Sequence, residues 1–325
     1  MSVNKKSRRD FLKLGVIAGG TLLTGSVVKT ALSGNEDKKS GEKVKMLTQD
    51  GKLVEVDKSS ILPVGKYISP KEARQGIPNR KFVMVIDLAR CKNARKCVEV
   101  CQAGHHLPSD HEWMKVYLMQ DSEKSFPYWF PRPCFHCDNP MCASVCPVGA
   151  TYKRTDGIVL VDSERCIGCK FCMTGCPYSV RVFNWKDPET PEQDKIKKYS
   201  PETGIPQVEG TVGKCVFCVD LLRTGELPRC VTGCPMGVIF FGDIFEDTVT
   251  NGTETFQLSQ LIKDRTAFRY LEFLGTEPSV YYLPPTQRLF PFERGLEDLD
   301  EKILARYKNT PFVLKMKNEN LNYGK

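Results

Sequence analysis

The sequence predicts an α+β fold, in which cysteine-rich loops and short helices alternate with strands. Two observations support this class. Apolar, strand-like runs occupy residues 81–88, 157–162 and 237–242. Four groups of closely spaced cysteines lie beside these runs, within residues 91–101, 134–146, 166–176 and 215–234. Because short apolar runs bounded by turn-forming residues favour strands, each cysteine group should sit on a loop and a short helix between strands.

Length and composition allow one large domain or two intermediate ones. The chain has 325 residues, of which 41% are hydrophobic, so a buried core is expected. Its formal net charge of +8 comes from basic residues dispersed among acidic ones. This dispersal argues against a continuous basic stripe, and we expect no nucleic-acid partner. The fifteen cysteines are many and odd in number, which favours metal ligation over a fully disulfide-paired scaffold.

The N-terminus carries adjacent arginines, Arg8 and Arg9, followed by a mildly apolar run at residues 14–28. This pattern resembles a twin-arginine export signal, and we expect residues 1–33 to form it. The run is shorter than the roughly 20 residues that a membrane-spanning helix needs, and no later segment meets that length. The twin-arginine translocase would export the folded chain to the periplasm or the exoplasmic face of the cytoplasmic membrane. The alternative is a basic tail before a buried helix.

A linker with a hairpin and a main domain follow the signal. Residues 34–80 form the linker and hairpin, since two alternating strands surround the turn-forming pair Asp50-Gly51. Residues 81–245 hold all four cysteine groups and form the main domain. We expect an inner module at about 130–185 and a proline-containing insertion at 186–213 that runs over the surface.

Residues 246–325 form the predicted C-terminal extension. Apolar residues recur with helical periodicity over 258–274 and 293–307, which predicts two amphipathic helices. Between them, the stretch 275–284 should close the domain against the sheet.

The third cysteine group indicates the chemistry most directly. Cys166, Cys169, Cys172 and Cys176, followed by Pro177, form a C-x2-C-x2-C-x3-C-P run with the spacing of a bacterial ferredoxin motif. In this motif three thiolates wrap one iron-sulfur cluster, and the fourth ligates a neighbouring cluster. The second and fourth groups also end in Cys-Pro. Zinc sites and disulfides are the alternatives, but zinc ribbons lack the x3-C-P ending.

Residues 82–245, with four such groups in succession, resemble the iron-sulfur subunit of the dimethyl sulfoxide, polysulfide and tetrathionate reductase class of molybdenum enzymes. The resemblance implies two nested bacterial-ferredoxin-like modules, with groups two and three inside a module made by groups one and four. It also implies four sets of cysteine ligands for iron, which we name clusters a to d. Cluster a has Cys91, Cys97 and Cys234; cluster b has Cys215, Cys218, Cys230 and Cys101; cluster c has Cys134, Cys137, Cys142 and Cys176; cluster d has Cys166, Cys169, Cys172 and Cys146.

Cluster a lacks a fourth thiolate because Ala94 occupies the position of the second cysteine in the motif. A 3Fe-4S cluster needs only the three remaining thiolates, and we favour this outcome. A 4Fe-4S cluster would need a substitute ligand, for which Asp87, His105 and His106 are candidates by position. Loss of the cluster would leave reactive thiols in an exported protein. The expected cofactors are therefore three 4Fe-4S clusters and one 3Fe-4S cluster.

Two further features near the cysteines are open to different interpretations. Lys92, Arg95 and Lys96 surround Ala94 and form either a docking patch or a solvated loop. His136 lies between two cysteines of the second group, where it either tunes a cluster or packs in the core.

These features predict a non-catalytic subunit that passes single electrons along its clusters. No catalytic residue can be named, since the chain offers no recognisable nucleophile, base or substrate pocket. By the resemblance, one partner is a catalytic subunit that contains molybdopterin, and the other is an integral membrane quinone-binding subunit or a cytochrome. A hydrogenase-linked or cytochrome-linked electron-transfer subunit would carry the same motifs. A structural metal-binding protein is the alternative from a non-redox class.

Overall fold

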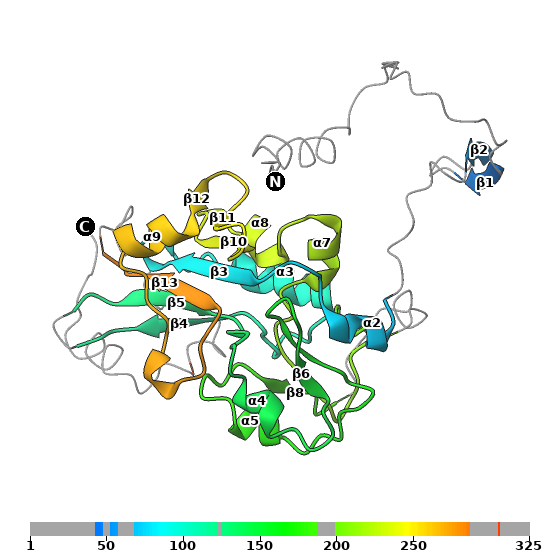
Figure 1. Cartoon of the computed structure of the whole chain (residues 1–325), viewed down its shortest axis with the longest axis horizontal. Coiled ribbons are helices and arrows are strands. Elements are labelled where there is room, and N and C mark those ends of the chain that lie inside the picture. Colours follow the sequence, from blue (N-terminus) through cyan, green and yellow to red (C-terminus); the bar gives the residue numbers. More distant parts are fainter. Residues whose placement is uncertain are drawn as a thin grey trace, which may run out of the picture. The chain divides into compact units, whose positions relative to one another are not determined.

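The computed structural model describes residues 43–47, 53–57, 68–122, 125–186, 199–286 and 305. The chain divides into two compact units, Met1–Lys66 and Tyr67–Lys325. The first unit contains an antiparallel hairpin of β1 (Lys43–Leu47) and β2 (Leu53–Asp57) (Figure 1). The two strands predicted on either side of Asp50-Gly51 are thereby confirmed. The proposed signal at residues 1–33 lies outside the described residues.

The second unit is built on a five-stranded sheet with the strand order β12-β11-β10-β3-β13. Its strands are β3 (Phe82–Asp87), β10 (Ile239–Asp243), β11 (Thr248–Thr250), β12 (Thr255–Gln257) and β13 (Val280–Leu283). Strand β3 pairs antiparallel with β10 and parallel with β13. The strands predicted near 81–88 and 237–242 are therefore neighbours in one sheet.

Side chains of β3 alternate between two apolar layers. Met84 and Ile86 face the large core that also contains cysteine-bearing segments. Val83 and Val85 pack on the other face against α9 (Leu258–Asp264). All four side chains are fully buried. Because both faces of β3 are covered, the strand reads as a nearly continuous apolar run in the sequence.

Short hairpins and short helices carry the cysteine groups. The hairpins pair β4 (Lys115–Met119) with β5 (Tyr128–Arg132), β6 (Thr151–Lys153) with β7 (Val159–Val161), and β8 (Val182–Phe183) with β9 (Val212–Gly213). The helices are α3 (Lys96–His105), α4 (Met141–Ser144), α5 (Phe171–Thr174), α7 (Val219–Thr224) and α8 (Arg229–Thr232). Each of these helices contains or directly follows a cysteine. The α+β class and the loop-and-short-helix setting of the cysteine groups are thus confirmed.

Helix α2 (Pro70–Gln75) begins where the sequence supplies a complete N-terminal cap. The Ser69 hydroxyl accepts from the backbone N–H of Glu72, and the Glu72 carboxylate accepts from the backbone N–H of Ser69. Pro70 occupies the first turn, where its missing donor costs nothing. A 3-10 turn, η2 (Leu88–Arg90), leads from β3 into the first cysteine group.

The predicted helix over 258–274 is wrong beyond Asp264. Helix α9 ends there, and Thr266 adopts a positive φ of 46° that a helix cannot continue through. The chain then extends so that Phe268 forms a bridge with Tyr282 of β13, and a 3-10 turn, η3 (Glu272–Leu274), follows. The predicted helix at 293–307 lies outside the described residues except for residue 305, which is in a turn.

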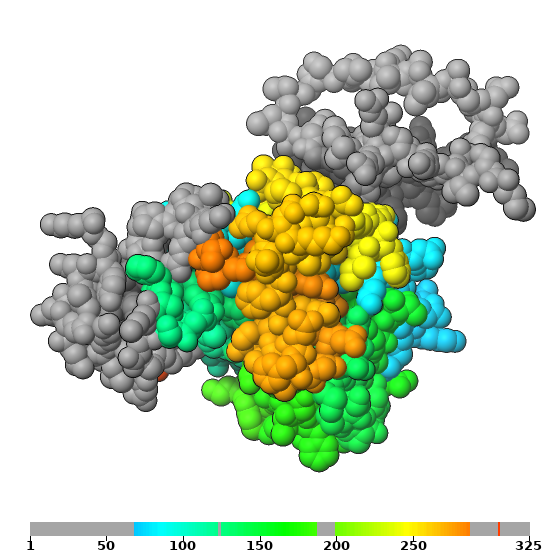
Figure 2. All heavy atoms as spheres, turned by 60° about the vertical axis from the view of Figure 1, so that its left-hand side comes forward, coloured from blue at the N-terminus to red at the C-terminus, as the bar shows by residue number. Residues whose placement is uncertain are grey.

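Residues 275–284 do more than cover the sheet, because they include β13, which is the edge strand of the central sheet. Just before β13, the carbonyl of Glu277 accepts from the N–H of Asp138 at 2.8 Å, and the N–H of Ser279 donates to the carbonyl of Phe135 at 2.9 Å. These two hydrogen bonds therefore connect the second cysteine group to the central sheet. In Figure 2 the yellow and orange residues from α9 to β13 cover one face of the domain and meet the green residues. Among the described residues, no helix has the length and apolarity to cross a membrane.

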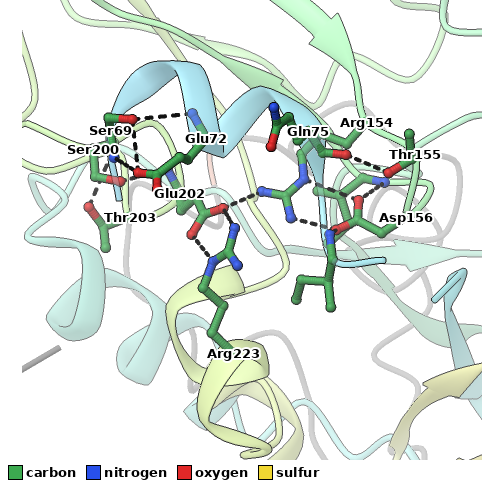
Figure 3. Close-up of polar contacts among 12 residues, drawn as sticks. Ser69, Glu72, Gln75, Arg154, Thr155, Asp156, Ser200, Glu202, Thr203 and Arg223 are labelled. Carbon is green, nitrogen blue, oxygen red and sulfur yellow. Dashed lines mark hydrogen bonds and ion pairs between the residues drawn. The ribbon is translucent and has the colours of Figure 1, made fainter. Parts of the chain in front are cut away.

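The prolines of the insertion at 186–213 predicted a surface loop. In the part of the insertion that the structure describes, this prediction is wrong. Glu202 is buried, and its carboxylate accepts from Arg154 at 2.6 Å and from two nitrogens of Arg223 at 2.6 Å (Figure 3). Arg154 also pairs with Asp156. Glu202 thus ties the insertion to the turn between β6 and β7 and to α7, because a buried carboxylate requires such cationic partners.

Candidate iron-sulfur cluster sites

Two helix contacts bring the cysteine groups together in pairs. Helix α3 of the first group packs against α8 of the fourth, and α4 of the second group packs against α5 of the third. Figure 1 shows α4 and α5 side by side. One group alone supplies only part of a ligand set, so a shared set requires such contacts.

The thiols assigned to cluster d line one cavity. Cys166, Cys169 and Cys172 surround it from the third group, and Cys146 enters from the second. Cys169 is exposed, whereas Cys172 is buried. The cavity therefore lies near the protein surface and is surrounded by four thiols from two groups.

Backbone amides prepare the Cys146 thiol for ionisation. Burial opposes the charged form, but the N–H groups of Thr151, Val148, Ala150 and Gly149 outweigh it and lower the pKa of this thiol. The N–H of Thr151 lies 3.5 Å from its sulfur. A thiolate is the form that ligates iron, so this amide cluster fits a ligand of cluster d.

The thiols assigned to cluster a line a second cavity. Cys91, Cys97 and Cys234 surround it, and Ala94 occupies the position between the first two. Burial raises the pKa of the Cys91 thiol to about 12, and the nearby Cys234 acts in the same direction. Such thiols lose their protons only when a cation such as iron compensates the charge.

The three candidate substitute ligands do not line this cavity. The carboxylate of Asp87 instead accepts from the N–H of Ala89 and from Arg90, both at 3.1 Å. His105 lies beside another thiol, with Nε2 3.5 Å from Sγ of Cys218 in cluster b. The geometry therefore offers none of these residues as a fourth ligand for cluster a.

In clusters b and c, the thiols of each set lie close enough to affect one another's pKa. The pKa of Cys230 lies well above its ordinary value, first through burial and then through the other thiols of cluster b, which are Cys218, Cys215 and Cys101. Burial also raises the pKa of Cys137 to about 12, together with the other thiols of cluster c, which are Cys134, Cys142 and Cys176. Each thiol resists ionisation because the others lie close to it.

Thiol pairs that cross from one set to the next give the order of the sets. In each pair, a thiol of one set interacts electrostatically with a thiol of the next set. The pairs are Cys97 with Cys101, Cys215 with Cys134, and Cys172 with Cys142. The first pair joins a to b, the second joins b to c, and the third joins c to d. The assigned sets therefore adjoin one another in the order a, b, c, d.

The cysteines are free thiols, and two of the four sets surround a cavity. All fifteen cysteines lie in described residues, and none is joined in a disulfide. Within the described ranges, no three Cys, His, Asp or Glu side chains converge closely enough to hold one metal ion. A zinc ion would need its sulfur ligands about 2.3 Å from a common centre. Two of the thiol sets surround cavities instead.

His136 adds a buried donor to this region. Its Nδ1 accepts from the N–H of Val159 at 3.0 Å, so the neutral ring carries its proton on Nε2. Burial and then Lys214 hold the pKa of His136 well below its ordinary value. The Nε2–H group has no hydrogen-bond partner among the described residues. A cluster sulfur would supply the acceptor that such a buried donor requires.

The three basic residues around Ala94 differ in their surroundings. Arg95 is largely buried and pairs with Glu112 at 2.6 Å, while Lys96 is exposed and pairs with Glu99 at 2.6 Å. Arg95 is therefore part of the interior, and a docking patch here would depend on Lys92 and Lys96.

Arg181 and Lys214 were not identified from the sequence, and the structure places these two basic residues beside the cysteine thiols. Both are buried beside the thiols of clusters b, c and d. Their position could have suggested this, since Lys214 directly precedes Cys215 and Arg181 follows the third group by a few residues. Basic residues beside cysteine groups occur throughout this chain, however, and only the fold separates buried ones from exposed ones.

Comparison with known proteins agrees with this geometry. Residues 125–198 and 165–239 each match the model of a 4Fe-4S dicluster domain. The chain is 34% identical over 298 residues to a selenate reductase subunit of Mesobacillus selenatarsenatis, covering 85% of this chain and 97% of that protein. It is 34% identical over 232 residues to a tetrathionate reductase subunit of Salmonella typhimurium, covering 69% and 82%.

A third relative is the iron-sulfur cluster-binding subunit of menaquinone reductase from Nitratidesulfovibrio vulgaris. It is 38% identical over 235 residues, covering 62% of this chain and 88% of that protein. The chain therefore belongs to the family of iron-sulfur electron-transfer subunits of the dimethyl sulfoxide and tetrathionate reductase class.

Proposed function

We propose that this chain carries single electrons along four clusters, in the order a, b, c, d, between a catalytic subunit and a membrane partner. The linear order of the thiol sets is the observation that carries the proposal. Electrons pass between redox centres only where the centres are close, and each set here has a thiol beside the next set. The clusters supply the one-electron chemistry when bound.

The chain's own residues hold and insulate this array. Cys134, Cys215 and Cys230 are buried, and Phe135 and Phe217 lie in the same apolar core. An apolar shell limits water access and thereby shifts reduction potentials. No catalytic role is needed from any residue, because the work of the protein is to fix the positions of its clusters and to set their potentials.

The ligand sets proposed for this function are those of the sequence analysis. Three 4Fe-4S clusters would occupy b, c and d, and a 3Fe-4S cluster would occupy a. The cavity at Ala94 supports the three-iron form, because three thiols and none of the predicted substitutes line it. Two nested modules, with α3 and α8 in one and α4 and α5 in the other, would hold the four clusters.

The partners follow from the relatives. Their names include selenate, tetrathionate and menaquinone reductases. We infer that one partner of this chain is a molybdopterin-containing catalytic subunit and that the other is an integral membrane quinone-binding subunit or a cytochrome. Export by the twin-arginine translocase would place the complex on the periplasmic or exoplasmic face of the membrane. The adjacent arginines Arg8 and Arg9 support that location.

Anaerobic purification of the native complex through a tag on the full chain tests this function. Molybdenum and nickel are measured, the clusters are reduced with dithionite, and a soluble menaquinone analogue is added while EPR follows their re-oxidation. We expect molybdenum in the complex and rapid re-oxidation of all clusters. In a Cys142→Ser variant, which lacks a ligand of cluster c, rapid re-oxidation should stop at the interrupted position and leave the clusters beyond it reduced.

Three results would contradict the proposal in different ways. Nickel in place of molybdenum would indicate the hydrogenase-linked alternative. A chain that purifies alone, without partners, would contradict its role as a subunit. Unchanged re-oxidation of every cluster in Cys142→Ser would show that electrons do not travel along the proposed line.

A further inference from the structure

Two cations are buried side by side among the cysteine thiols. The side chains of Arg181 and Lys214 come from residues that are only 4% and 1% exposed. Arg181 directly precedes β8 and Lys214 directly follows β9, and these strands pair antiparallel with Val182 opposite Gly213. The hairpin register therefore places both cations at the same end of one short hairpin.

Neither cation has a carboxylate partner within the described residues. The Arg181 guanidinium donates to the hydroxyl of Thr151 at 3.2 Å, and its other hydrogen-bonding neighbours are the thiols of Cys142 and Cys172. The Lys214 ammonium donates to the carbonyls of Val159 and Cys215. A surface hollow lined in part by Arg181 also contains Asp110 and Glu112, but neither carboxylate forms an ion pair with it.

A buried cation without a counter-charge costs several kcal/mol, and two neighbouring ones also repel each other. The groups around them that can carry a negative charge are thiols. The strongest attractive neighbours of Arg181 are Cys142, Cys172 and Cys134, and these thiolates raise its pKa although burial acts to lower it. Burial lowers the pKa of Lys214, and Arg181 acts in the same direction, while its attractive neighbours Cys134, Cys215 and Cys142 act against both. The counter-charge is therefore expected from the cysteine sites themselves.

The two lists of neighbours overlap at cluster c. Cys134 and Cys142 interact with both cations, whereas Cys172 of cluster d interacts with Arg181 and Cys215 of cluster b with Lys214. No thiol of cluster a is among the main neighbours of either cation. A cluster ligated by thiolates has a net negative charge that grows by one on reduction, so a nearby buried cation favours the reduced form.

We propose that Arg181 and Lys214 set the reduction potential of cluster c, which they raise more than that of any other cluster in the chain. Cluster d receives a smaller increase from Arg181 alone, cluster b receives one from Lys214 alone, and cluster a receives almost none. The middle of the line thereby becomes a site where an electron is stabilised. This inference rests on the proposed ligand sets and on the electron-transfer function.

Redox titration followed by EPR, on the full chain with its clusters, tests the inference in Arg181→Met and Lys214→Met. Arg165→Met is the matched control, because Arg165 also neighbours a cluster cysteine but its side chain is 59% exposed and therefore screened by solvent. The midpoint potential of cluster c should fall in both variants. That of cluster d should fall mainly in Arg181→Met, and that of cluster b mainly in Lys214→Met. The control should leave all four potentials close to their original values.

The conservative variant Arg181→Lys separates charge from shape. It should keep the potential of cluster c near the wild-type value, since it keeps the buried charge. If Arg181→Met fails to load cluster c while Arg181→Lys loads it, the charge requirement is supported. Failure of both variants to load would overturn the inference, because the guanidinium shape would then be the requirement.

Unchanged potentials in loaded Met variants, or equal shifts of all four clusters, would also overturn the inference. These failures are distinct from failure of the proposed function. If the proposed function were wrong, the wild-type chain itself would hold no iron-sulfur clusters, or its clusters would not exchange electrons with the quinone analogue.

Discussion

The imidazole of His136 packs against the ring of Phe217, with the ring centroids 3.7 Å apart and the ring planes tilted by 30°. Each residue is third in a C-x2-C pair, Cys134–Cys137 for the first and Cys215–Cys218 for the second. Both have positive φ values, 43° and 56°. This contact therefore joins the loop of cluster c to the loop of cluster b.

Buried neutral histidines make the stability of the loaded chain depend on pH. Burial, with Arg229 as the next cause, lowers the pKa of His105 to about 4, and the pKa of His136 lies well below its ordinary value. Below about pH 6.5 the unfolded chain binds protons that the folded chain does not. Stability should therefore fall as the pH falls from about 6.5 towards 4, by up to about 1.4 kcal/mol per pH unit for each histidine.

Urea unfolding at pH 7.5 and 5.5 measures this loss. His105→Gln is the comparison, since glutamine can still donate to the carbonyl of Thr203, which lies 3.0 Å from Nδ1 of His105, but does not titrate. Its stability should change less with pH than that of the wild type. Equal pH dependence in the two proteins would show that His105 does not contribute.

Gly168 lies between two cluster d cysteines and has no room for a side chain. It has a φ of +69°, and a Cβ there would lie 2.3 Å from the carbonyl oxygen of Gly210. Gly168→Ala should therefore displace the loop and lower the occupancy of cluster d, as measured by iron content and EPR. Gly275→Ala is the matched control, because its φ of +68° is similar but nothing lies within 4 Å. The control should cost only about 1–2 kcal/mol in stability and keep cluster d. Equal iron loss in both variants would contradict the steric explanation.

Cysteine spacing made much of this site predictable. The interval between thiols within one group is local information and indicated iron-sulfur chemistry, whereas the resemblance to the family implied which groups share a cluster. The strands that flank the groups were also predictable, because β3 is buried on both faces and has almost no polar residue to interrupt it. The predicted ligand sets themselves remain predictions, although the fold brings the members of each set together.

Tertiary contacts decided what could not be predicted. The prolines of the insertion favoured a surface loop, but Glu202 is drawn into the interior by Arg154 and Arg223, which are distant in sequence. Helical periodicity continued past Asp264, but pairing of Phe268 with Tyr282 competes with the helix. Burial of Arg181 and Lys214 depends in the same way on the pairing of β8 with β9.

Loss of the Glu202 carboxylate should destabilise the domain. Glu202→Gln would leave the fully buried Arg154 and the partly buried Arg223 without their shared partner, at a cost of about 3 kcal/mol in unfolding free energy. Lys96→Met is the surface control, since Lys96 and Glu99 are both 56% exposed and their pair contributes less than about 1 kcal/mol. Urea unfolding of the loaded chain measures both values. A similar cost for the two variants would contradict the interior role of Glu202.

Restoring the missing thiol should change the type of cluster a. Ala94→Cys places a fourth thiol at the cavity lined by Cys91, Cys97 and Cys234. We expect the EPR signal of an oxidised 3Fe-4S cluster to disappear and the iron content to rise by about one atom per chain. Ala94→Val adds volume without sulfur and should not add iron. Persistence of the three-iron signal in Ala94→Cys would count against the assigned position of the vacancy.

Iron and sulfide quantitation, combined with EPR of the anaerobically purified wild-type chain, tests the central claim most directly. Three 4Fe-4S clusters and one 3Fe-4S cluster predict about 15 iron atoms per chain, with a paramagnetic three-iron signal in the oxidised state. About 12 iron atoms without that signal would contradict the assignment of cluster a. Zinc in place of iron and acid-labile sulfide would contradict the entire account of an electron-transfer chain.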